Sequence, residues 1–304
     1  MYKKTYRDMV SGETTPTIVT TEWLKDSLKS GWTNLRIIDG TFHMENSGRD
    51  ARAEYTKQHI PGATYFDING CADTTSQYDL PHMLPSVEQF EEYVGSRGID
   101  NESHVVVYDN NPMFPVFSAQ RVWWTFRCFG HDKVSILEGG LQKWLKAGGT
   151  VTEEASEMKR GVFKAQFRSN LVKSFDDVLS NVKSGEYVLI DARPPGRFQG
   201  TAPEPIPGVK PGHIPQALNV PFVKLMDTES KTYKSVDELK KIFEDNNVDL
   251  KKPIIFTCGS GLQASNLVLA SYLCGKEDAA MYDGSWVEWY RRAPADQMVD
   301  VPSE

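Results

Sequence analysis

Short apolar runs alternate along the chain with longer stretches in which apolar and polar residues recur at helical spacing. In the first half, the apolar runs are LRIID, which ends at Asp39, HVVVYD, which ends at Asp109, and VSILEGG. Each has the length of a buried strand, and stretches between them such as SVEQFEEYVGSRG are typical of amphipathic helices. Strands that alternate with helices predict an α/β fold, with a mostly parallel sheet flanked by helices on both faces.

The second half of the chain repeats this order. YVLID, which ends at Asp191, answers LRIID; HIPQALNVPF answers HIPGATYFDI; IIFTC, which ends at Cys258, answers VVVYD; and DGSWVEW answers EGGLQKW. The separation is 152 residues from Asp39 to Asp191 and 149 residues from Asp109 to Cys258. Such similar offsets predict two copies of one domain with small changes in loop length.

The length of the chain agrees with two domains, and its net charge bears on the class of partner. The chain has 304 residues, about twice the length of a typical domain, and the polar stretch from Thr150 to Arg160 separates the repeats. We expect a first domain over residues 1–150, a linker over 151–170 and a second domain over 171–304. The net charge of −7, without a long basic run, argues against nucleic acid as the main partner.

The cysteines and the chain start indicate the compartment. Four cysteines lie far apart, without CxxC or Cys/His ligand spacing, so neither a disulfide framework nor a metal site is expected, and no cofactor is predicted: Cys71, Cys128, Cys258 and Cys274. The first residues, MYKKTYRDMV, lack an apolar signal core, and no apolar run approaches the length of a membrane span. We expect a cytoplasmic protein, with a mitochondrial address left open.

Cys258 is the strongest candidate for chemistry. It lies between the apolar run Ile254 to Phe256 and the apolar stretch from Leu262 to Leu273, which is long enough for a packed helix. Gly259 and Gly261 allow the backbone to curl so that unpaired amides at the start of the helix point inward and stabilise a thiolate. The pKa of the thiol is therefore expected to be lowered, which suits a nucleophile. The alternative is a buried structural cysteine.

These motifs together resemble the two-domain rhodanese-family sulfurtransferases. The resemblance rests on the tandem order, HIPGA and HIPQA, the endings EGGxxxW and DGSxxEW, and CGSG starting at Cys258, and it extends from about Thr17 to Arg292. It implies tandem rhodanese-like domains and an enzyme that carries sulfur as a persulfide on Cys258. CGSG is similar to the loop of the branch that uses 3-mercaptopyruvate and releases pyruvate, whereas the thiosulfate-using branch typically has Arg and Lys after its cysteine. Asp109 takes the cysteine's place in the first domain, which is therefore expected to be non-catalytic.

The resemblance also implies the other site residues. Arg197 matches the arginine that binds the substrate carboxylate, and we favour that role; the alternative is an ordinary solvated surface arginine in a loop rich in proline and glycine. Ser260 and His82 match a catalytic pair that orients the substrate or moves a proton. The loop itself would bind the donor through its backbone, at Gly259, Gly261 and Leu262.

Two positions depart from the family pattern. Asn69 stands where the aspartate that orients the histidine is expected, with Asp67 or Asp73 as substitutes. Ile206 stands where a second substrate arginine is usual, and Lys210 could compensate for it. Because a charged hydrogen bond to the substrate would be lost, we expect a raised KM for 3-mercaptopyruvate or a different substrate.

The acceptor and the competing functions follow from the same resemblance. Thioredoxin, glutathione, another thiol or cyanide are the expected sulfur acceptors, and a monomer or weak dimer is expected. The alternatives are thiosulfate:cyanide sulfur transfer and a non-catalytic rhodanese-like binding module. A phosphatase of similar fold would need an arginine where Ala264 stands, so that reading is weak.

Overall fold

Two compact units make up the chain. The structure, a computed structural model, describes residues 15–114, 117–227, 229–230 and 232–302. Contacts group the described residues into a first unit and a second unit. Of the described residues, the first unit contains 15–71, 86–114, 117–167, 229–230 and 232, and the second contains 72–85, 168–227 and 233–302.

Each unit contains a five-stranded sheet in which all neighbouring strands are parallel. The first sheet has the order β1-β5-β4-β2-β3, with the strands Ile18–Val19 (β1), Leu35–Asp39 (β2), Ala63–Tyr65 (β3), His104–Tyr108 (β4) and Val134–Leu137 (β5). The second has the order β6-β12-β11-β7-β8, with Val172–Lys173 (β6), Val188–Asp191 (β7), Leu218–Asn219 (β8), Ile254–Thr257 (β11) and Ala280–Tyr282 (β12). The two orders match position by position.

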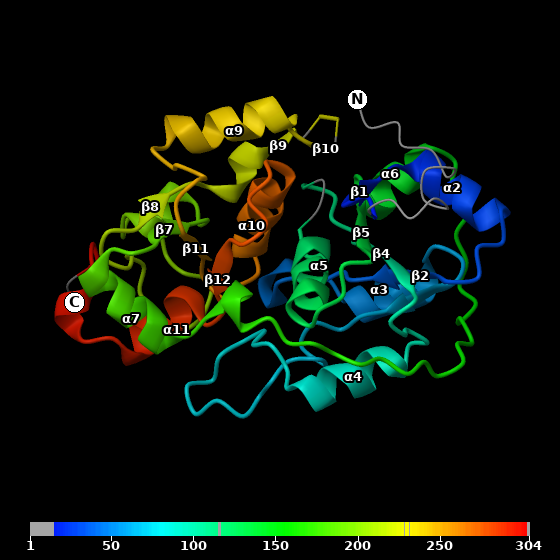
Figure 1. The fold of residues 1–304 in the computed structure, drawn as a ribbon, viewed down its shortest axis with the longest axis horizontal. Helices are drawn as coiled ribbons and strands as arrows, with labels where there is room; N and C mark the ends of the chain where they lie inside the picture. The colour runs from blue at the N-terminus through cyan, green and yellow to red at the C-terminus, as the bar shows by residue number, and fades with distance from the viewer. Residues whose placement is uncertain (1–14, 115–116, 228, 231, 303–304) are drawn as a thin grey trace. The chain divides into compact units, whose positions relative to one another are not determined.

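Helices flank each sheet, as Figure 1 shows. In the first unit they are Thr21–Lys29 (α2), Ala51–Lys57 (α3), Val87–Gly95 (α4), Ala119–Cys128 (α5) and Gly140–Lys146 (α6). In the second they are Phe175–Ser184 (α7), Pro195–Phe198 (α8), Val236–Asp245 (α9), Ala264–Leu273 (α10) and Ser285–Arg292 (α11). Short 3₁₀ turns (η1 Glu45–Ser47, η2 Ser169–Leu171, η3 Phe222–Leu225, η4 Ala295–Gln297) and a small pair of strands (β9 Met226–Asp227, β10 Thr232–Tyr233) complete the fold. The predicted tandem α/β fold is confirmed.

Polar residues at the helix starts explain where several helices begin. Thr20 and Ser86 accept hydrogen bonds from the third backbone amide of α2 and α4, and Ser174 and Ser235 form capping boxes at α7 and α9. By contrast, α5 and α10 have no side-chain cap. The first amides of these two helices therefore remain available to other groups.

The helices that follow the central strands are the most buried of the fold. All ten residues of α5 are buried, and α10 is buried from Ala264 to Ser271. The mostly apolar α10 is typical of a helix in a core, whereas α5 is buried together with polar residues such as Gln120, Arg121 and Arg127. Trp123, Trp124, Trp286 and Trp289 are all buried, so these tryptophans pack the interior.

Backbone hydrogen bonds repeat between the units as closely as the sequence motifs do. His59 pairs with Thr152 in an isolated antiparallel bridge, and His213 pairs with Val299 in the same way. Leu141 N donates to Asp109 O at 2.9 Å, and Trp286 N donates to Cys258 O at 2.9 Å. The two units therefore repeat specific backbone hydrogen bonds as well as sequence motifs.

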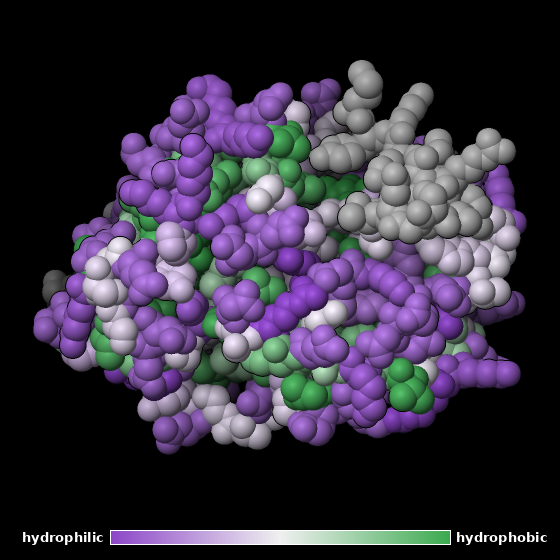
Figure 2. Space-filling view, in the orientation of Figure 1, coloured by the Kyte–Doolittle hydropathy of each residue, from purple (hydrophilic) through white to green (hydrophobic). Residues whose placement is uncertain are grey.

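Hydrophilic residues predominate on the face shown in Figure 2, where hydrophobic residues form small separate patches. In the part of the chain that the structure describes, no helix is both long enough and apolar enough to cross a membrane.

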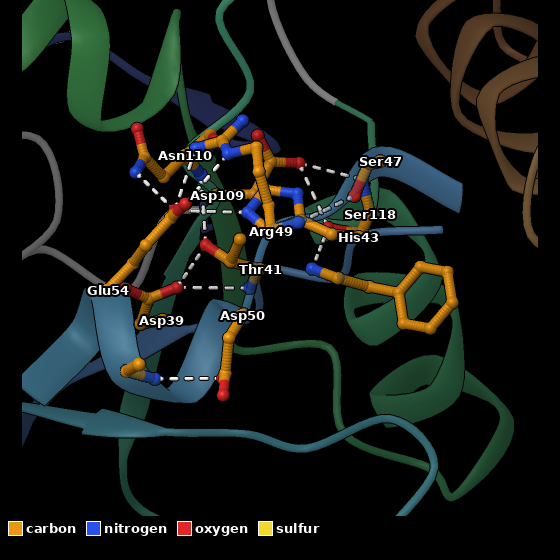
Figure 3. A network of polar contacts seen from close by, with 12 residues as sticks. Asp39, Thr41, His43, Ser47, Arg49, Asp50, Glu54, Asp109, Asn110 and Ser118 are labelled. Atoms are coloured by element: carbon orange, nitrogen blue, oxygen red, sulfur yellow. Dashed lines mark hydrogen bonds and ion pairs between the residues drawn. The ribbon is translucent and has the colours of Figure 1, made fainter. Parts of the chain in front are cut away.

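A buried polar network occupies the carboxyl end of the first sheet (Figure 3). Asp109, just after β4, accepts hydrogen bonds at Oδ2 from the amides of Phe117, Ser118 and Ala119 at 2.7, 2.7 and 2.9 Å. Nearby, Glu54 of α3 receives two hydrogen bonds of 2.7 Å from the guanidinium of Arg49. Although burial raises the pKa of Glu54, hydrogen bonds from Arg49 and His43 outweigh it and lower that pKa. Burial raises the pKa of Asp109 despite its three amide donors.

Asp39, the last residue of β2, lies in the same network without a cation of its own. Its Oδ1 accepts hydrogen bonds from the amide and the hydroxyl of Thr41. Burial raises the pKa of Asp39 from its ordinary 3.8 to about 7; hydrogen bonds from Thr41 and Tyr108 oppose the rise, and the charge of Asp109 adds to it. Asp39 therefore holds a proton in the folded chain over a range of pH in which an unfolded chain releases it.

We expect Asp39→Asn to remove a pH dependence from the stability of the first unit. Between about pH 4 and pH 7 the native state binds one proton more than the unfolded state, so this group's contribution to stability is lost as pH rises. The free energy of unfolding of the wild type should fall relative to Asp39→Asn by about 1.4 kcal/mol per pH unit in this window. Urea unfolding from pH 4.5 to pH 8 measures it. Asp50→Asn, at the exposed start of α3, is the control, and a difference between wild type and Asp39→Asn that does not vary with pH would contradict the assignment.

Candidate active site

Cys258 follows β11, the central strand of the second sheet, and directly precedes the turn that leads into α10. The side chains of all four residues of β11 are buried, and Cys258 itself is 1% exposed. Gly261 has a φ of 77°, in the left-handed region that glycine adopts without strain, and this residue turns the chain back toward the helix. The predicted placement of Cys258 between a strand and a helix is confirmed.

Backbone amides surround the sulfur of Cys258. Those of Ala264, Ser260 and Gln263 form hydrogen bonds that favour the thiolate. Burial is the larger effect, however, and together with the charge of Asp191 it raises the pKa of the Cys258 thiol above its usual value. The expected lowering of this pKa is therefore wrong, because the strand end that positions the amides also removes the sulfur from water. Deprotonation of the thiol then requires a base or the donor itself.

The start of α11 anchors the loop. Ser285 Oγ accepts a hydrogen bond from Cys258 N at 3.2 Å and donates one to Tyr282 O at 2.9 Å. Val287 N donates to Gly259 O at 3.0 Å, next to the corresponding bond from Trp286 N to Cys258 O. Ser285 is fully buried and has a φ of 53°, a backbone conformation that a residue with a Cβ adopts only at a cost. The hydroxyl thus fixes the amide of the candidate nucleophile.

A buried cluster of charges lies beside the loop. Arg193, two residues after β7, donates to Asp191 Oδ2 at 2.6 Å and to Glu204 Oε1 at 2.8 Å. The Arg193 side chain is 0% exposed, and its guanidinium lies 4.9 Å from the ring centroid of Trp286. The two carboxylates raise the pKa of Arg193 against the opposing effect of burial, which is the largest single influence. This cation is therefore committed to the fold and not to substrate.

Arg197 and Ser260 are available for a substrate. Arg197 lies on the short helix α8 and is partly buried, and its guanidinium forms no hydrogen bond or ion pair with the residues that the structure describes. Its charge acts on Glu204, which places it near the loop. The hydroxyl of Ser260 likewise has no hydrogen-bond partner among the described residues. Leu262 is 3% exposed, so only its backbone is suited to contact a donor.

His82 belongs to the same compact unit as Cys258. Its segment is tied to the start of α11 by the hydrogen bond from Leu84 N to Asp283 Oδ2 at 2.7 Å. His82 is 8% exposed and has a φ of 62°, so its backbone too is held in the left-handed region. Asp73 N donates to Met83 O at 3.1 Å, so the backbone of Asp73 contacts the residue that follows His82.

The other suggested partner of His82 belongs to the other unit. Asp67 and Asn69 both lie in the first unit, where Asp67 Oδ1 accepts a hydrogen bond from Asn69 N at 3.0 Å. The carboxylate of Asp67 thus stabilises its own turn. Between the two substitutes that the sequence suggests for the missing aspartate, Asp73 is the one that shares a segment with His82.

The structure explains the departure at Ile206 and shows what its suggested substitute, Lys210, contacts. Ile206 packs against the hydrophobic core of the second unit, which includes Trp286. Lys210 Nζ donates to Pro302 O at 3.4 Å, and Lys210 O accepts a hydrogen bond from Trp286 Nε1 at 2.8 Å. Ile206 therefore contributes packing in place of charge, and the ammonium of Lys210 interacts with the C-terminal segment.

Three residues of this site were not identified from the sequence: Arg193, Glu204 and Ser285. For Ser285 the sequence contained a signal, because the repeat aligns this residue with a glycine, Gly140. In the structure, a Cβ added at Gly140 would lie 2.3 Å from Asp109 O. For Arg193 and Glu204 the spacing gives no sign that they meet. Among the described residues, no group of three or more His, Cys, Asp or Glu side chains is arranged to hold a metal ion.

Comparison with known proteins agrees with this geometry. The model of the rhodanese-like domain matches the chain twice, at residues 20–147 and 174–292. Thiosulfate sulfurtransferase of Rattus norvegicus is 48% identical over 285 residues, which cover 93% of this chain and 94% of the relative. 3-Mercaptopyruvate sulfurtransferase of Mus musculus is 43% identical over 284 residues, with the same coverage.

A solved structure gives the same result. The crystal structure of SseA from Escherichia coli, described as a 3-mercaptopyruvate sulfotransferase with a rhodanese fold, superposes with a TM-score of 0.79 at 37% identity and covers 90% of this chain and 99% of its own. The family model matches well over half of the chain, and the relatives cover nearly all of it. The chain therefore belongs to the family of two-domain, rhodanese-like sulfurtransferases.

Proposed function

We propose that the protein transfers sulfur from 3-mercaptopyruvate to a thiol or cyanide through a persulfide on Cys258. The observation that carries the proposal is a buried sulfur at the end of the central strand, where the backbone amides of Ser260, Gln263 and Ala264 favour negative charge on it. Such donors stabilise the negative charge of a thiolate and of the persulfide that replaces it.

The first half-reaction balances without an external oxidant. The sulfur of Cys258 attacks the sulfur of 3-mercaptopyruvate, the bond between that sulfur and carbon breaks, and the electron pair remains on the leaving pyruvate enolate. The proton given up by the Cys258 thiol is the one that the enolate carbon finally takes. Ser260 and His82 are the proposed residues for moving this proton, since both belong to the same unit as Cys258.

The second half-reaction regenerates the enzyme. A thiol attacks the outer sulfur of the persulfide, and Cys258 leaves as a thiolate. Thioredoxin and glutathione are the proposed acceptors, with cyanide as a small substitute. The wide separation of the four cysteines in the sequence supports a reducing compartment, and we propose the cytoplasm, with the mitochondrion as the alternative.

The choice of donor rests on charge. Gly259 and Ser260 leave the loop without a cation, and Arg197 is the guanidinium suited to a single carboxylate. Thiosulfate:cyanide transfer is the second candidate, and the 48% identity to a thiosulfate sulfurtransferase favours it. The two candidates share Cys258 and differ in how many negative charges the donor brings to the loop.

Incubation with 3-mercaptopyruvate should add one sulfur atom to Cys258 and release one pyruvate per active site. The reason is that the persulfide is stable until an acceptor arrives. Intact-protein mass spectrometry in a single turnover, with thiosulfate as the second donor, measures the added sulfur, and Cys258→Ser is the control. Release of pyruvate without added sulfur on the wild type would contradict the persulfide route, and faster loading from thiosulfate would favour the second candidate.

Ile206→Arg should lower the KM for 3-mercaptopyruvate. A well-formed charged hydrogen bond contributes about 1.5–3 kcal/mol, so the KM should fall roughly tenfold or more. The aliphatic part of arginine can still cover the core surface on which Ile206 packs. Steady-state kinetics measure the effect, with Ile206→Gln as an uncharged control. An unchanged KM in the arginine variant, or an equal fall in both variants, would contradict a missing carboxylate contact.

Ser285→Ala should destabilise the active loop. It leaves the buried amide of Cys258 without its acceptor, which costs about 1–3 kcal/mol. Ser285→Gly loses the same hydroxyl but relieves the left-handed backbone by about 1 kcal/mol, so it should be the more stable of the two. Urea unfolding measures the stability, and the rate of persulfide formation should fall in both variants. Wild-type stability and rate in Ser285→Ala would show that the hydroxyl does not position the loop.

A further inference from the structure

In the first unit, a segment of the chain itself fills a groove between the ends of α4 and α5. Residues 158–167, which form no helix or strand, run past α4 in Figure 1. Gly161 N donates to Gly95 O, at the end of α4, and Gln166 N donates to Phe129 O, just after α5, both at 2.9 Å. The backbone of this segment is therefore bound to both helix ends.

Charge holds the same segment in place. Lys164 Nζ donates to Glu91 Oε2 at 3.1 Å, and Ala165 N donates to the other oxygen of this carboxylate at 2.9 Å. Arg160 forms an ion pair with Glu92, the next residue of α4. A basic segment thus lies against acidic side chains of α4.

The second unit has a corresponding groove. The turns that follow α9 and α10 repeat those that follow α4 and α5, at offsets of 149 and 145 residues: Val248 N to Phe243 O answers Ile99 N to Val94 O, and Lys276 N to Ser271 O answers His131 N to Phe126 O. A pocket of about 710 Å³ is lined by residues 247–251 and 274–276, with Lys240 and Glu244 of α9. We call it the α9–α10 groove. Its lining residues include the counterparts of residues that bind the segment in the first unit: Glu91, Gly95, Asn101 and Phe129.

The glycines after α5 and α10 show how the two grooves differ. A Cβ added at Gly130 would lie 2.7 Å from Gln166 O, whereas a Cβ added at its counterpart, Gly275, meets no described atom within 4 Å. Cys274 O, the counterpart of Phe129 O, accepts no hydrogen bond from the described residues. The described residues therefore leave open in the second unit the space that the segment takes in the first.

The charge at the groove is reversed between the units. Lys240 stands where Glu91 binds Lys164 in the first unit, and Lys251 stands where the first unit has Glu102. The ammonium groups of Lys240 and Lys251 form no ion pair with the described residues. A chain that lay in the second groove as the segment lies in the first would place its counterpart of Lys164 opposite a lysine, where an acidic side chain is stabilised.

Other lining residues restrict where such a chain lies. Glu244 and Asn247 replace glycines at which an added Cβ would lie 2.9 Å from the first-unit segment, at its residues Gly161 and Met158. The charge of Glu244 also repels an acidic chain at this end. Leu250 replaces an asparagine whose amide binds the backbone of the segment, so it offers an apolar contact instead. The second groove therefore fits a counterpart of the later half of the segment.

We propose that the α9–α10 groove is a docking site for an acidic, extended segment of a partner protein. The bound segment donates a backbone amide to Cys274 O, places a carboxylate opposite Lys240 and packs an apolar side chain against Leu250. Main-chain hydrogen bonds give such a complex its affinity, and the side-chain contacts give it specificity. The proposal is independent of the sulfur donor, because the groove does not include Cys258.

The test uses the full chain and two fluorescent peptides. The basic peptide has the sequence of residues 161–168, GVFKAQFR, and the acidic peptide has Glu in place of Lys164 and Arg168. Fluorescence anisotropy measures the Kd of each peptide. The acidic peptide should bind the wild type about tenfold or more tightly than the basic peptide, because only the acidic one is attracted by Lys240.

Lys240→Glu should exchange the preference. Like charges placed opposite each other repel, so this variant should bind the acidic peptide about tenfold or more weakly than the wild type does, and the basic peptide more tightly. Lys241→Glu is the matched control, because it makes the same change at the next residue of α9, which pairs with Asp245 and does not line the groove. It should keep the wild-type preference, and urea unfolding reports whether both variants are folded.

Photo-cross-linking to the wild type locates the bound peptide without a variant. An acidic peptide with benzoylphenylalanine in place of Phe163 should cross-link to residues that line the groove, as mass spectrometry of the digested complex would show. Cross-links confined to other surfaces, equal binding of the two peptides, or no saturable binding up to about 1 mM would overturn the proposal. Light scattering tests another occupant: a wild-type dimer that Lys240→Glu dissociates would assign the groove to a second copy of the chain and overturn the proposed partner.

Discussion

Both units are built around one constraint: a hydrogen-bond acceptor is buried at the carboxyl end of the central parallel strand, beside the first amides of an uncapped helix. In the second unit this atom is the sulfur of Cys258, between β11 and α10. In the first unit it is Oδ2 of Asp109, between β4 and α5. Because the amides have no helical partners of their own, each unit needs an acceptor at this place. A carboxylate satisfies the amides permanently, whereas a sulfur satisfies them and can still react.

The same comparison explains the charges that surround the two positions. The last residue of the neighbouring strand is an aspartate in both units, Asp39 and Asp191, and both are buried. Asp191 is neutralised by Arg193, but the corresponding position in the first unit is Thr41, which supplies only hydrogen bonds, and Asp39 takes up a proton instead. The second unit thus has a buried ion pair at the position where the first unit has hydrogen bonds alone.

The fold and the main residue of the site could be predicted from the sequence because they depend on local patterns. Apolar runs ending at Asp39, Asp109, Asp191 and Cys258 mark the strand ends, and the repeat supports each of them with a second copy. The direction of the pKa shift of Cys258 could not be predicted in this way. The amides that lower it follow from the turn, but the burial that raises it depends on how the whole unit packs.

Long-range contacts account for the other residues that the sequence did not reveal. Arg193 and Glu204 are eleven positions apart, in a loop without periodicity, and only the folded loop brings their side chains to 2.8 Å. Ser285 stands where its repeat partner is a glycine, and its left-handed φ is visible only in the structure. Likewise, Ile206 is conspicuous in the sequence as a missing cation, and only packing reveals its contribution to the core.

Donor choice in such a site is a matter of charge balance more than of any single contact. In the proposed reaction Cys258 becomes an anion. Glu204 and Asp191 share the guanidinium of Arg193, and Arg197 is a cation that forms no ion pair with the described residues. These groups already leave an excess of negative charge, so a donor with one carboxylate adds less to that excess than a donor with two negative charges. Overall identity, which is 48% to a thiosulfate sulfurtransferase and 43% to a 3-mercaptopyruvate sulfurtransferase, averages over hundreds of positions that do not touch this balance. The few residues that face the sulfur are therefore the better guide to the donor.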